Sequence, residues 1–243
     1  MCLLTTPSTE TDLEKMAKKL GTDLFGIADV TIAQDFVCNQ GGEFLRKFSR
    51  AISIGVRLLD AVVNELYRHE DPAVIYTYTA LYNSVNSHLD DVGLLLAKGI
   101  QEKGYQAYAI PASQTVDSNK LIGVFSHKLA ANLAGLGWIG KSCLLITPRY
   151  GPRVRFATIL TDAPLKAGSP IGEKCEDCRE CMDICPVKAF TGAPFNPLEP
   201  REVRFNAHLC RSYFKKREEK LGDGRCGLCV YVCPYGRSNK SLP

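Results

Sequence analysis

The chain has 243 residues, of which 45% are hydrophobic and 23% charged, and a formal net charge of +4. No stretch approaches the ~18 consecutive apolar residues that span a bilayer. The N-terminal segment MCLLTTPSTETD has no basic residue before its short apolar run, so a secretory signal is not expected and we predict a cytoplasmic protein. Eleven cysteines in such a protein favour metal binding over disulfides.

Apolar spacing predicts a mixture of helices and strands. Thr11 and Glu14 form a capping box for a first helix that Gly21 ends. Buried strands are predicted at 24–30, 51–59 and 105–112, and helices at 43–49, 73–103 and 127–137. The segments KSCLLIT and VRFATILT flank PRYGP, which predicts a hairpin. Because strands and helices do not alternate regularly, the predicted class is α+β.

The segment 163–174, APLKAGSPIGEK, has the composition of a linker. We therefore expect two domains, an α+β domain over residues 1–165 and a cysteine-rich module over residues 166–243. The module also contains a basic run, Lys215, Lys216, Arg217 and Lys220. A solvated helix face explains this run more simply than a docking patch for an acidic partner.

The cysteine spacing predicts two [4Fe–4S] clusters. The run CEDCRECMDICP is followed by a second set of three cysteines that again ends in Cys-Pro, with a further cysteine upstream. In such runs the cysteine before the proline ligates the other cluster. The first predicted ligand set is therefore Cys175, Cys178, Cys181 and Cys233. The second set is Cys185, Cys210, Cys226 and Cys229.

Zinc also uses cysteine pairs at this spacing, but a zinc site does not need the C-x3-C-P element, which occurs here twice. The remaining cysteines, Cys2, Cys38 and Cys143, are expected to be ordinary small side chains. Bound clusters would bring the charge of the protein close to neutral, so a nucleic-acid partner is not expected.

A glycine-rich string, NLAGLGWIGKS, precedes the module. Its glycines, Gly135, Gly137 and Gly140, surround the single tryptophan, Trp138. Glycine at this density allows the backbone to approach a flat ligand, whose polar edge Lys141 and Ser142 could bind. Helix-end glycines beside a buried tryptophan would produce the same pattern, and spacing alone leaves both interpretations open.

Several blocks together resemble a known family. DLFGIADV, AISIGVRLL, AGLGWIGK and LTDAPL, followed by the two cysteine runs, are similar to epoxyqueuosine reductases and to the catalytic part of corrinoid-dependent reductive dehalogenases. The resemblance implies a nitroreductase-like domain followed by a ferredoxin-like domain with two [4Fe–4S] clusters. It also implies cobalamin between them, with the glycine–tryptophan string at the cofactor. None of the four histidines lies in a D-x-H-x-x-G motif, so no protein ligand to cobalt is indicated.

The chain departs from the family at two substrate-handling blocks. It lacks the G-R-D-Y-H block, whose aspartate is the family's proton donor in epoxyqueuosine reduction, and also the D-S-x-P-x-x-E-R block. The corresponding tract, IYTYTALYNSVNSHLDD, carries Tyr78 and Tyr82 on one helix face. A tyrosine can donate a proton. These two are therefore the candidate catalytic residues, although packing against the sheet would explain them equally well.

The leading hypothesis is an anaerobic iron–sulfur reductase that passes electrons through two clusters to cobalamin and on to a small organic substrate. Its expected electron donor is of the ferredoxin or flavodoxin type. One alternative is an electron-transfer protein whose front domain is filled by its own side chains. A second is an activator that reduces a corrinoid for a partner enzyme, and a third replaces cobalamin by FMN.

Overall fold

The computed structural model describes residues 10–196 and 199–237. These residues form two compact units, each made of three segments. Unit 1 comprises the described residues of Met1–Val56, Val85–Leu136 and Arg155–Ile171. Unit 2 comprises those of Arg57–Ser84, Gly137–Val154 and Gly172–Pro243. The α+β class is confirmed, whereas the domain boundary at residue 165 stays a prediction.

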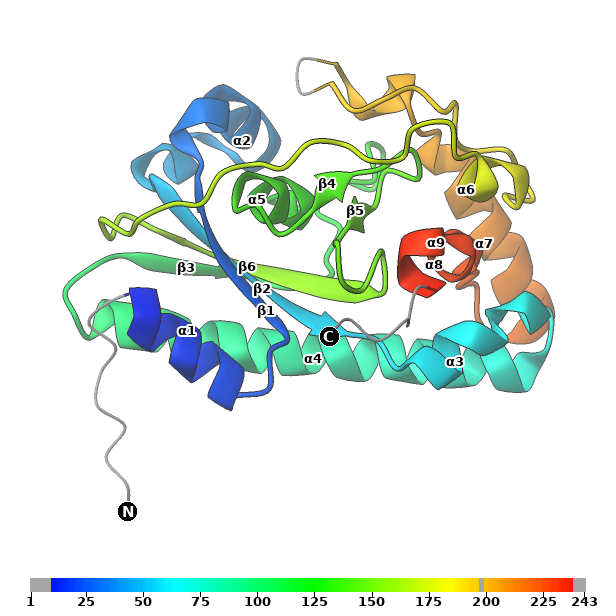
Figure 1. The fold of residues 1–243 in the computed structure, drawn as a ribbon, viewed down its shortest axis with the longest axis horizontal. Helices are drawn as coiled ribbons and strands as arrows, with labels where there is room; N and C mark the ends of the chain where they lie inside the picture. The colour runs from blue at the N-terminus through cyan, green and yellow to red at the C-terminus, as the bar shows by residue number, and fades with distance from the viewer. Residues whose placement is uncertain (1–9, 197–198, 238–243) are drawn as a thin grey trace. The chain divides into compact units, whose positions relative to one another are not determined.

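Unit 1 is built on a four-stranded sheet with the order β1-β2-β6-β3 (Figure 1). The strands are β1 (Leu24–Asp29), β2 (Arg50–Arg57), β3 (Ala107–Ile110) and β6 (Val154–Thr161). β1 pairs antiparallel with β2, and β3 pairs antiparallel with β6. Residues 51–55 of β2 and 156–161 of β6 are all buried, as expected for the two inner strands of a covered sheet.

Short helices complete unit 1. They are α1 (Glu10–Lys19), η1 (Thr31–Ala33), α2 (Gln34–Gly41), η2 (Glu43–Lys47) and α5 (His127–Leu133). Both α1 and α5 pack on β1. The core includes Leu45 within η2, Phe48 directly after it, Phe125 before α5, and Leu160 on β6. Apolar groups buried in this way supply most of the stability of such a unit.

The helix α4 (Pro72–Gln101) runs through both units and confirms the long helix predicted at 73–103. It begins where Asp71 Oδ1 accepts a hydrogen bond from the Ala73 amide at 2.9 Å, with Pro72 in the first turn. In unit 1 its buried residues, Leu89, Val92, Leu96 and Ile100, recur at the spacing of one helix face. No helix in the described residues is long and apolar enough to cross a membrane.

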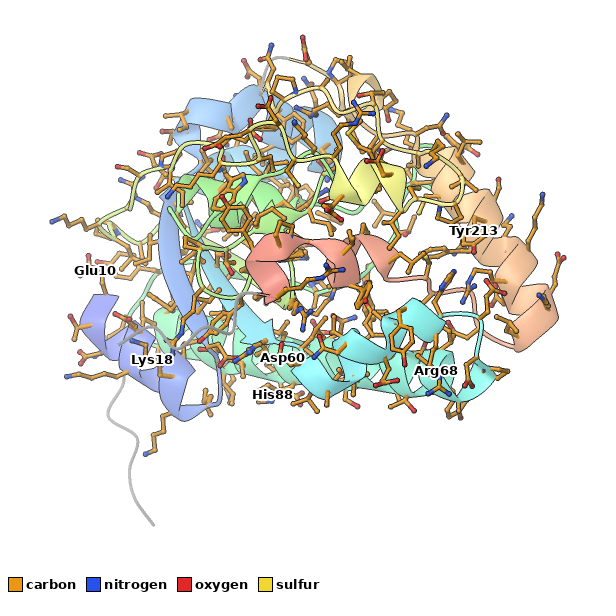
Figure 2. All side chains as sticks on the ribbon, turned by 45° about the vertical axis from the view of Figure 1, so that its right-hand side comes forward. Glu10, Lys18, Asp60, Arg68, His88 and Tyr213 are labelled. Atoms are coloured by element: carbon orange, nitrogen blue, oxygen red, sulfur yellow. The ribbon has the colours of Figure 1, made fainter. Side chains whose placement is uncertain are left out.

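Unit 2 contains short elements arranged around α8. These are α3 (Asp60–Asn64), η3 (Glu65–Arg68), β4 (Trp138–Ile139), β5 (Leu145–Ile146), α6 (Glu180–Asp183), η4 (Arg201–Val203), α7 (Ala207–Leu221), α8 (Leu228–Val232) and α9 (Pro234–Arg237). The helices α3, α6, α9 and η3 all pack against α8. Beside α3, the buried Arg153 donates to Asp60 at 3.0 Å and to Asn64 at 2.8 Å (Asp60 is labelled in Figure 2).

Two predictions about local structure were wrong. The expected hairpin between KSCLLIT and VRFATILT does not form, because β5 pairs with β4 and β6 pairs with β3. Only an isolated bridge from Thr147 to Gly151 closes the intervening loop. The described part of α1 begins at Glu10, so Thr11 lies inside the helix and is not its N-cap.

Candidate metal centre

Four cysteines of unit 2 line one cavity, and they are the first predicted ligand set: Cys175, Cys178, Cys181 and Cys233. The remaining wall is formed by Lys141, Ser142, Ile146, Glu180, Pro234 and Tyr235. A turn joins the first two cysteines, with the Cys178 amide donating to the Cys175 carbonyl at 2.9 Å. Cys181 follows on α6, and Cys233 lies in extended conformation between α8 and α9. The proline after Cys233 starts α9 and turns the chain away.

The pKa values of Cys181 and Cys233 in this set are raised, mainly by burial. Burial, and then the charges of Cys175, Cys178 and Cys233, raise the pKa of Cys181 to about 12. Burial also raises the pKa of Cys233 to about 11, although the amides of Tyr235 and Gly236 oppose the shift. Thiolates that repel one another need a cation between them, and a coordinating metal deprotonates such thiols outright. The set is therefore chemically suited to iron.

The other four predicted ligands also interact with one another. Burial, followed by the charges of Cys226 and Cys185, raises the pKa of Cys210 to about 11. Burial is likewise the main cause of the raised pKa of Cys229, and Cys226, Cys210, Cys181 and Cys185 add to it. Three of these four neighbours belong to the second set, while Cys181 belongs to the first. The first predicted set thus lines one cavity, while Cys210 and Cys229 of the second set each lie near other members of that set. The assignment of all eight cysteines to two clusters stays a prediction.

Among the described residues, no three histidine, cysteine, aspartate or glutamate side chains converge closely enough to hold a single metal ion. The cysteines outside the two sets, Cys38 and Cys143, are buried, as expected of small apolar side chains. Cys2 lies outside the described residues.

Lys141 and Ser142 of the string GWIGKS line the four-cysteine cavity. At Gly140 a Cβ atom would lie 3.1 Å from Cys175 Sγ and 2.8 Å from the Ile146 side chain, so glycine allows the cysteine loop to approach. Lys141 Nζ donates to the carbonyl of Glu176 and, at 3.3 Å, to that of Cys178. Ser142 is buried and lines the cavity. These three residues therefore support the loop that carries the first two cysteines.

The other glycines of the string pack against the protein itself. Gly135 follows α5 at a φ of +77°, and a Cβ there would lie 2.5 Å from the Ser169 carbonyl oxygen. At Gly137 a Cβ would lie 2.3 Å from the Ile146 carbonyl oxygen. Chain packing thus explains both glycines, and their contact with a corrinoid stays a prediction.

Trp138 is 1% exposed and packs edge-on against Tyr235, with ring centroids 4.8 Å apart. Its indole N–H has no hydrogen-bond partner among the described residues. It nevertheless lies near enough to Cys175 to lower the pKa of that thiol, against the larger effect of burial. The indole N–H therefore interacts with the Cys175 thiol from outside ordinary hydrogen-bond geometry. A buried orphan donor beside a thiol fits a site whose acceptor arrives with a bound group.

Tyr78 and Tyr82 are neighbours on α4, with ring centroids 6.4 Å apart. Tyr78 is 4% exposed and packs against Gly227, where an added Cβ would lie 3.0 Å from its ring. The guanidinium of Arg225 lies 4.6 Å from the centre of the Tyr82 ring. Both tyrosines therefore face the segment around Cys226, and neither lines the four-cysteine cavity. Their role as proton donors stays a prediction.

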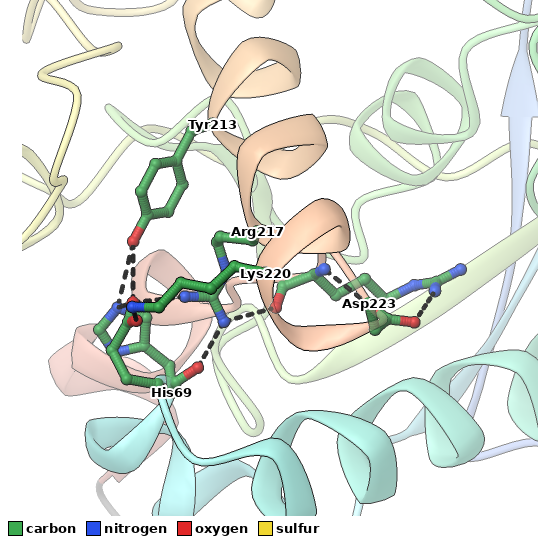
Figure 3. A network of polar contacts seen from close by, with 7 residues as sticks. His69, Tyr213, Arg217, Lys220 and Asp223 are labelled. Carbon is green, nitrogen blue, oxygen red and sulfur yellow. Dashed lines mark hydrogen bonds and ion pairs between the residues drawn. The ribbon is translucent and has the colours of Figure 1, made fainter.

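One polar cluster was missed by the sequence analysis (Figure 3). The basic run was expected to be solvated, yet Arg217 is 3% exposed. Its guanidinium donates to Glu70 at 2.6 Å and to the carbonyl of His69. The positive charge also lowers the pKa of Cys226, although burial raises it more. The expectation for Arg217 was wrong because its partners lie far away in the sequence.

Comparison with known protein families adds to this geometry. Residues 174–236, which carry all eight predicted ligands, match the family model of the 4Fe-4S double cluster binding domain. This segment, about a quarter of the chain, is therefore similar to domains that bind [4Fe–4S] clusters. The similarity favours iron–sulfur clusters over zinc, since the matched model describes clusters.

Curated relatives include the epoxyqueuosine reductase of Listeria monocytogenes, 31% identical over 127 residues, and that of Bacillus anthracis, 30% identical over 152 residues. The tetrachloroethene reductive dehalogenase of Sulfurospirillum multivorans is 32% identical over 157 residues. These alignments cover 48%, 60% and 59% of this chain, but only 31%, 39% and 28% of the relatives. The chain thus matches about a third of the length of each.

Solved structures share the fold. A catabolic reductive dehalogenase superposes with a TM-score of 0.68 at 17% identity, covering 94% of this chain and 32% of the other. An epoxyqueuosine reductase bound to a modified tRNA stem loop superposes with a TM-score of 0.57 at 20% identity, covering 96% and 66%. The resemblance to epoxyqueuosine reductases and reductive dehalogenases is confirmed.

Proposed function

We propose that the protein is an iron–sulfur reductase that holds two [4Fe–4S] clusters in its crossed cysteine sets and delivers low-potential electrons to a corrinoid and then to a small organic substrate. The observation that carries the proposal is the cavity lined by Cys175, Cys178, Cys181 and Cys233, which lies within the segment that matches the double-cluster family model. Ferredoxin-like two-cluster folds use this crossed pattern. The front part of the chain is then proposed to be nitroreductase-like.

The residues around the first set are suited to hold a cluster. Gly140 gives the Cys175 loop room to approach, Lys141 holds the loop by two carbonyls, and Pro234 directs Cys233 into the cavity. The cluster, when bound, supplies one-electron transfer at low potential. The four cysteines are half-buried, which limits the access of water to their sulfurs.

The proposal that the protein binds a corrinoid is supported by the protein's structural relatives. One structural neighbour is a reductive dehalogenase whose structure suggests a mechanism for B12-dependent dehalogenation. The closest neighbours of Gly135 and Gly137 in this chain are its own backbone atoms. This packing favours the alternative in which the front part is filled by protein and the chain is an electron-transfer protein or a corrinoid-reducing activator.

The relatives suggest two very different classes of substrate. The curated dehalogenase acts on tetrachloroethene by its name, whereas one epoxyqueuosine reductase was solved with a tRNA stem loop. The expectation that nucleic acid is no partner is therefore unsupported, and a tRNA stem loop belongs in any substrate screen. The absent G-R-D-Y-H block favours a small molecule over epoxyqueuosine.

The test is anaerobic reconstitution with iron and sulfide, followed by titration with cob(II)alamin under EPR and visible spectroscopy. We expect two cluster signals and saturable binding of one corrinoid, with a changed cobalt spectrum. Two clusters with an unchanged cob(II)alamin spectrum would support the electron-transfer alternative. A flavin spectrum in the purified protein would replace cobalamin by FMN, and failure to assemble any cluster would overturn the proposal.

A further inference from the structure

The indole N–H of Trp138 is a buried donor with no partner of its own. The side chain is 1% exposed, and the nitrogen has no hydrogen-bond partner among the described residues. Buried polar groups are almost always paired, so each exception calls for a physical reason. An acceptor that is present only in the loaded protein would be such a reason.

Three observations place this donor near the first cysteine set. Trp138 pairs on the short β4–β5 ladder with Ile146, and Ile146 lines the four-cysteine cavity. Two residues further along the chain, Gly140 lies against Cys175 Sγ. The Trp138 indole and the Lys141 amide both lie close enough to Cys175 to oppose the rise in the pKa of its thiol that burial causes.

The indole is also held in place. Tyr235 packs edge-on against its ring at 4.8 Å, and the Tyr235 hydroxyl donates to the Lys174 carbonyl at 2.8 Å, immediately before Cys175. The same aromatic pair thus contacts both the strand that carries Trp138 and the loop that carries Cys175. A small adjustment of this loop on cluster binding would bring the sulfur and the indole N–H into hydrogen-bond geometry.

We infer that Trp138 donates its indole N–H to the Cys175 sulfur, or to an adjacent sulfide, of the cluster in the first set, and thereby raises the reduction potential of that cluster. This inference rests on the proposed function. The reduced cluster carries one more negative charge than the oxidised cluster, so a hydrogen bond to its sulfur is stronger after reduction. Hydrogen bonds to the sulfurs are among the factors that set cluster potentials. Trp138 is a positioning and tuning residue and carries no electron itself.

The test compares the reconstituted full chain with its Trp138→Phe variant by redox titration monitored with EPR. Removing the N–H should make reduction of one cluster about tenfold less favourable, which corresponds to ~59 mV for a one-electron couple. The other cluster, held by the second set, should keep its potential and serves as the internal control. Pulsed ENDOR of the reduced protein should also show an exchangeable proton coupled to one cluster that is absent from the variant.

A second variant guards against a packing defect. Trp138→β-(3-benzothienyl)alanine keeps the size and shape of the indole but has no N–H, and it should shift the potential in the same direction and by a similar amount. If both variants assemble two clusters with unchanged potentials and an unchanged ENDOR spectrum, the inference is wrong while the proposed function stands. If the unmodified chain assembles no cluster, both fail together.

Discussion

The buried guanidinium of Arg217 on α7 donates to the carboxylate of Glu70, which precedes α4, at 2.6 Å. The side chain of Arg217 is 4% exposed, whereas that of Glu70 is 52% exposed. The arginine is therefore fixed by the protein, and the glutamate can exchange its partner for water. This asymmetry determines what a substitution at each position should do.

Replacing Arg217 with methionine should destabilise the protein by about 2 kcal/mol, because the carbonyls of His69 and Arg225 lose buried donors. Arg217→Lys should recover only part of this loss, since an ammonium lacks the planar fork that reaches both carbonyls. Urea unfolding of the loaded protein measures the effect. The matched control is Lys220→Met, which removes an exposed ion pair at 3.5 Å to the same glutamate. Equal losses for Arg217→Met and Lys220→Met would contradict this account.

The approach of Gly140 to Cys175 can be tested by adding one methyl group. In Gly140→Ala the new Cβ would lie 2.8 Å from Ile146 and 3.1 Å from Cys175 Sγ, so the cysteine loop must move. We expect the variant to lose about half of its reconstituted iron, the share of one of two [4Fe–4S] clusters. Gly172→Ala is the control, because nothing lies within 4 Å of the added atom. Full iron content in Gly140→Ala would show that this contact does not matter for assembly.

The crossed ligand assignment predicts which pairs of substitutions act on the same cluster. Cys175→Ser with Cys233→Ser should remove one cluster and leave about four irons per chain, because both thiols belong to the first set. Cys210→Ser with Cys233→Ser should remove both clusters. Iron analysis and EPR distinguish these outcomes. An uncrossed arrangement would reverse them, and Cys38→Ser, outside both sets, should leave the iron content unchanged.

His127 predicts a pH dependence of stability. Its ring is buried between Thr158 Oγ1 at 2.8 Å and the Pro111 carbonyl at 2.9 Å, and burial lowers its pKa to about 4. In the unfolded chain, where a histidine has a pKa of about 6.5, the imidazole is protonated at pH values at which the folded chain keeps it neutral. Between these two values the free energy of unfolding therefore falls as pH falls, by up to about 3 kcal/mol from this group.

Urea unfolding at several pH values between these limits measures the effect. In His127→Gln this contribution should disappear and leave the shallower slope of the remaining groups, which include His69, whose pKa burial also lowers. His88→Gln, at a partly exposed histidine, should keep the slope of the parent protein. If His127→Gln also keeps that slope, the buried imidazole is not its source.

Much of the fold was predictable because its signals are local. The apolar spacing of Leu89, Val92, Leu96 and Ile100 defines one face of α4 without reference to any partner. The cysteine spacing likewise grouped Cys175, Cys178, Cys181 and Cys233, which line one cavity in the structure, whereas the assignment of all eight cysteines as cluster ligands stays a prediction. The hairpin prediction failed because its signal was not local. Strand-forming residues lie both before and after β5, and the packing of the folded chain selects β4 as its partner.

Several residue roles around the site could not be predicted from local sequence patterns. Nothing near Arg217 in the sequence distinguishes it from the solvated Lys220, because its acceptors His69 and Glu70 come from a segment far upstream. Lys141 was predicted to bind a ligand, whereas in the structure its ammonium holds carbonyls of the cysteine loop. Lys141 and Glu176 are 35 positions apart, with β5 and β6 between them, so no local pattern indicates this contact.

Cys233 shares a cavity with Cys175, although almost the whole double-cluster segment separates them along the chain. Under the proposed crossed assignment, a ribosome that has released only the first cysteine run would have exposed three ligands of one site and a single ligand of the other. Neither proposed site would have its full complement until α8 has been synthesised. Cluster insertion would then be tied to late translation, and a nascent chain that stalls before Cys226 would present incomplete sets of thiols to oxidants.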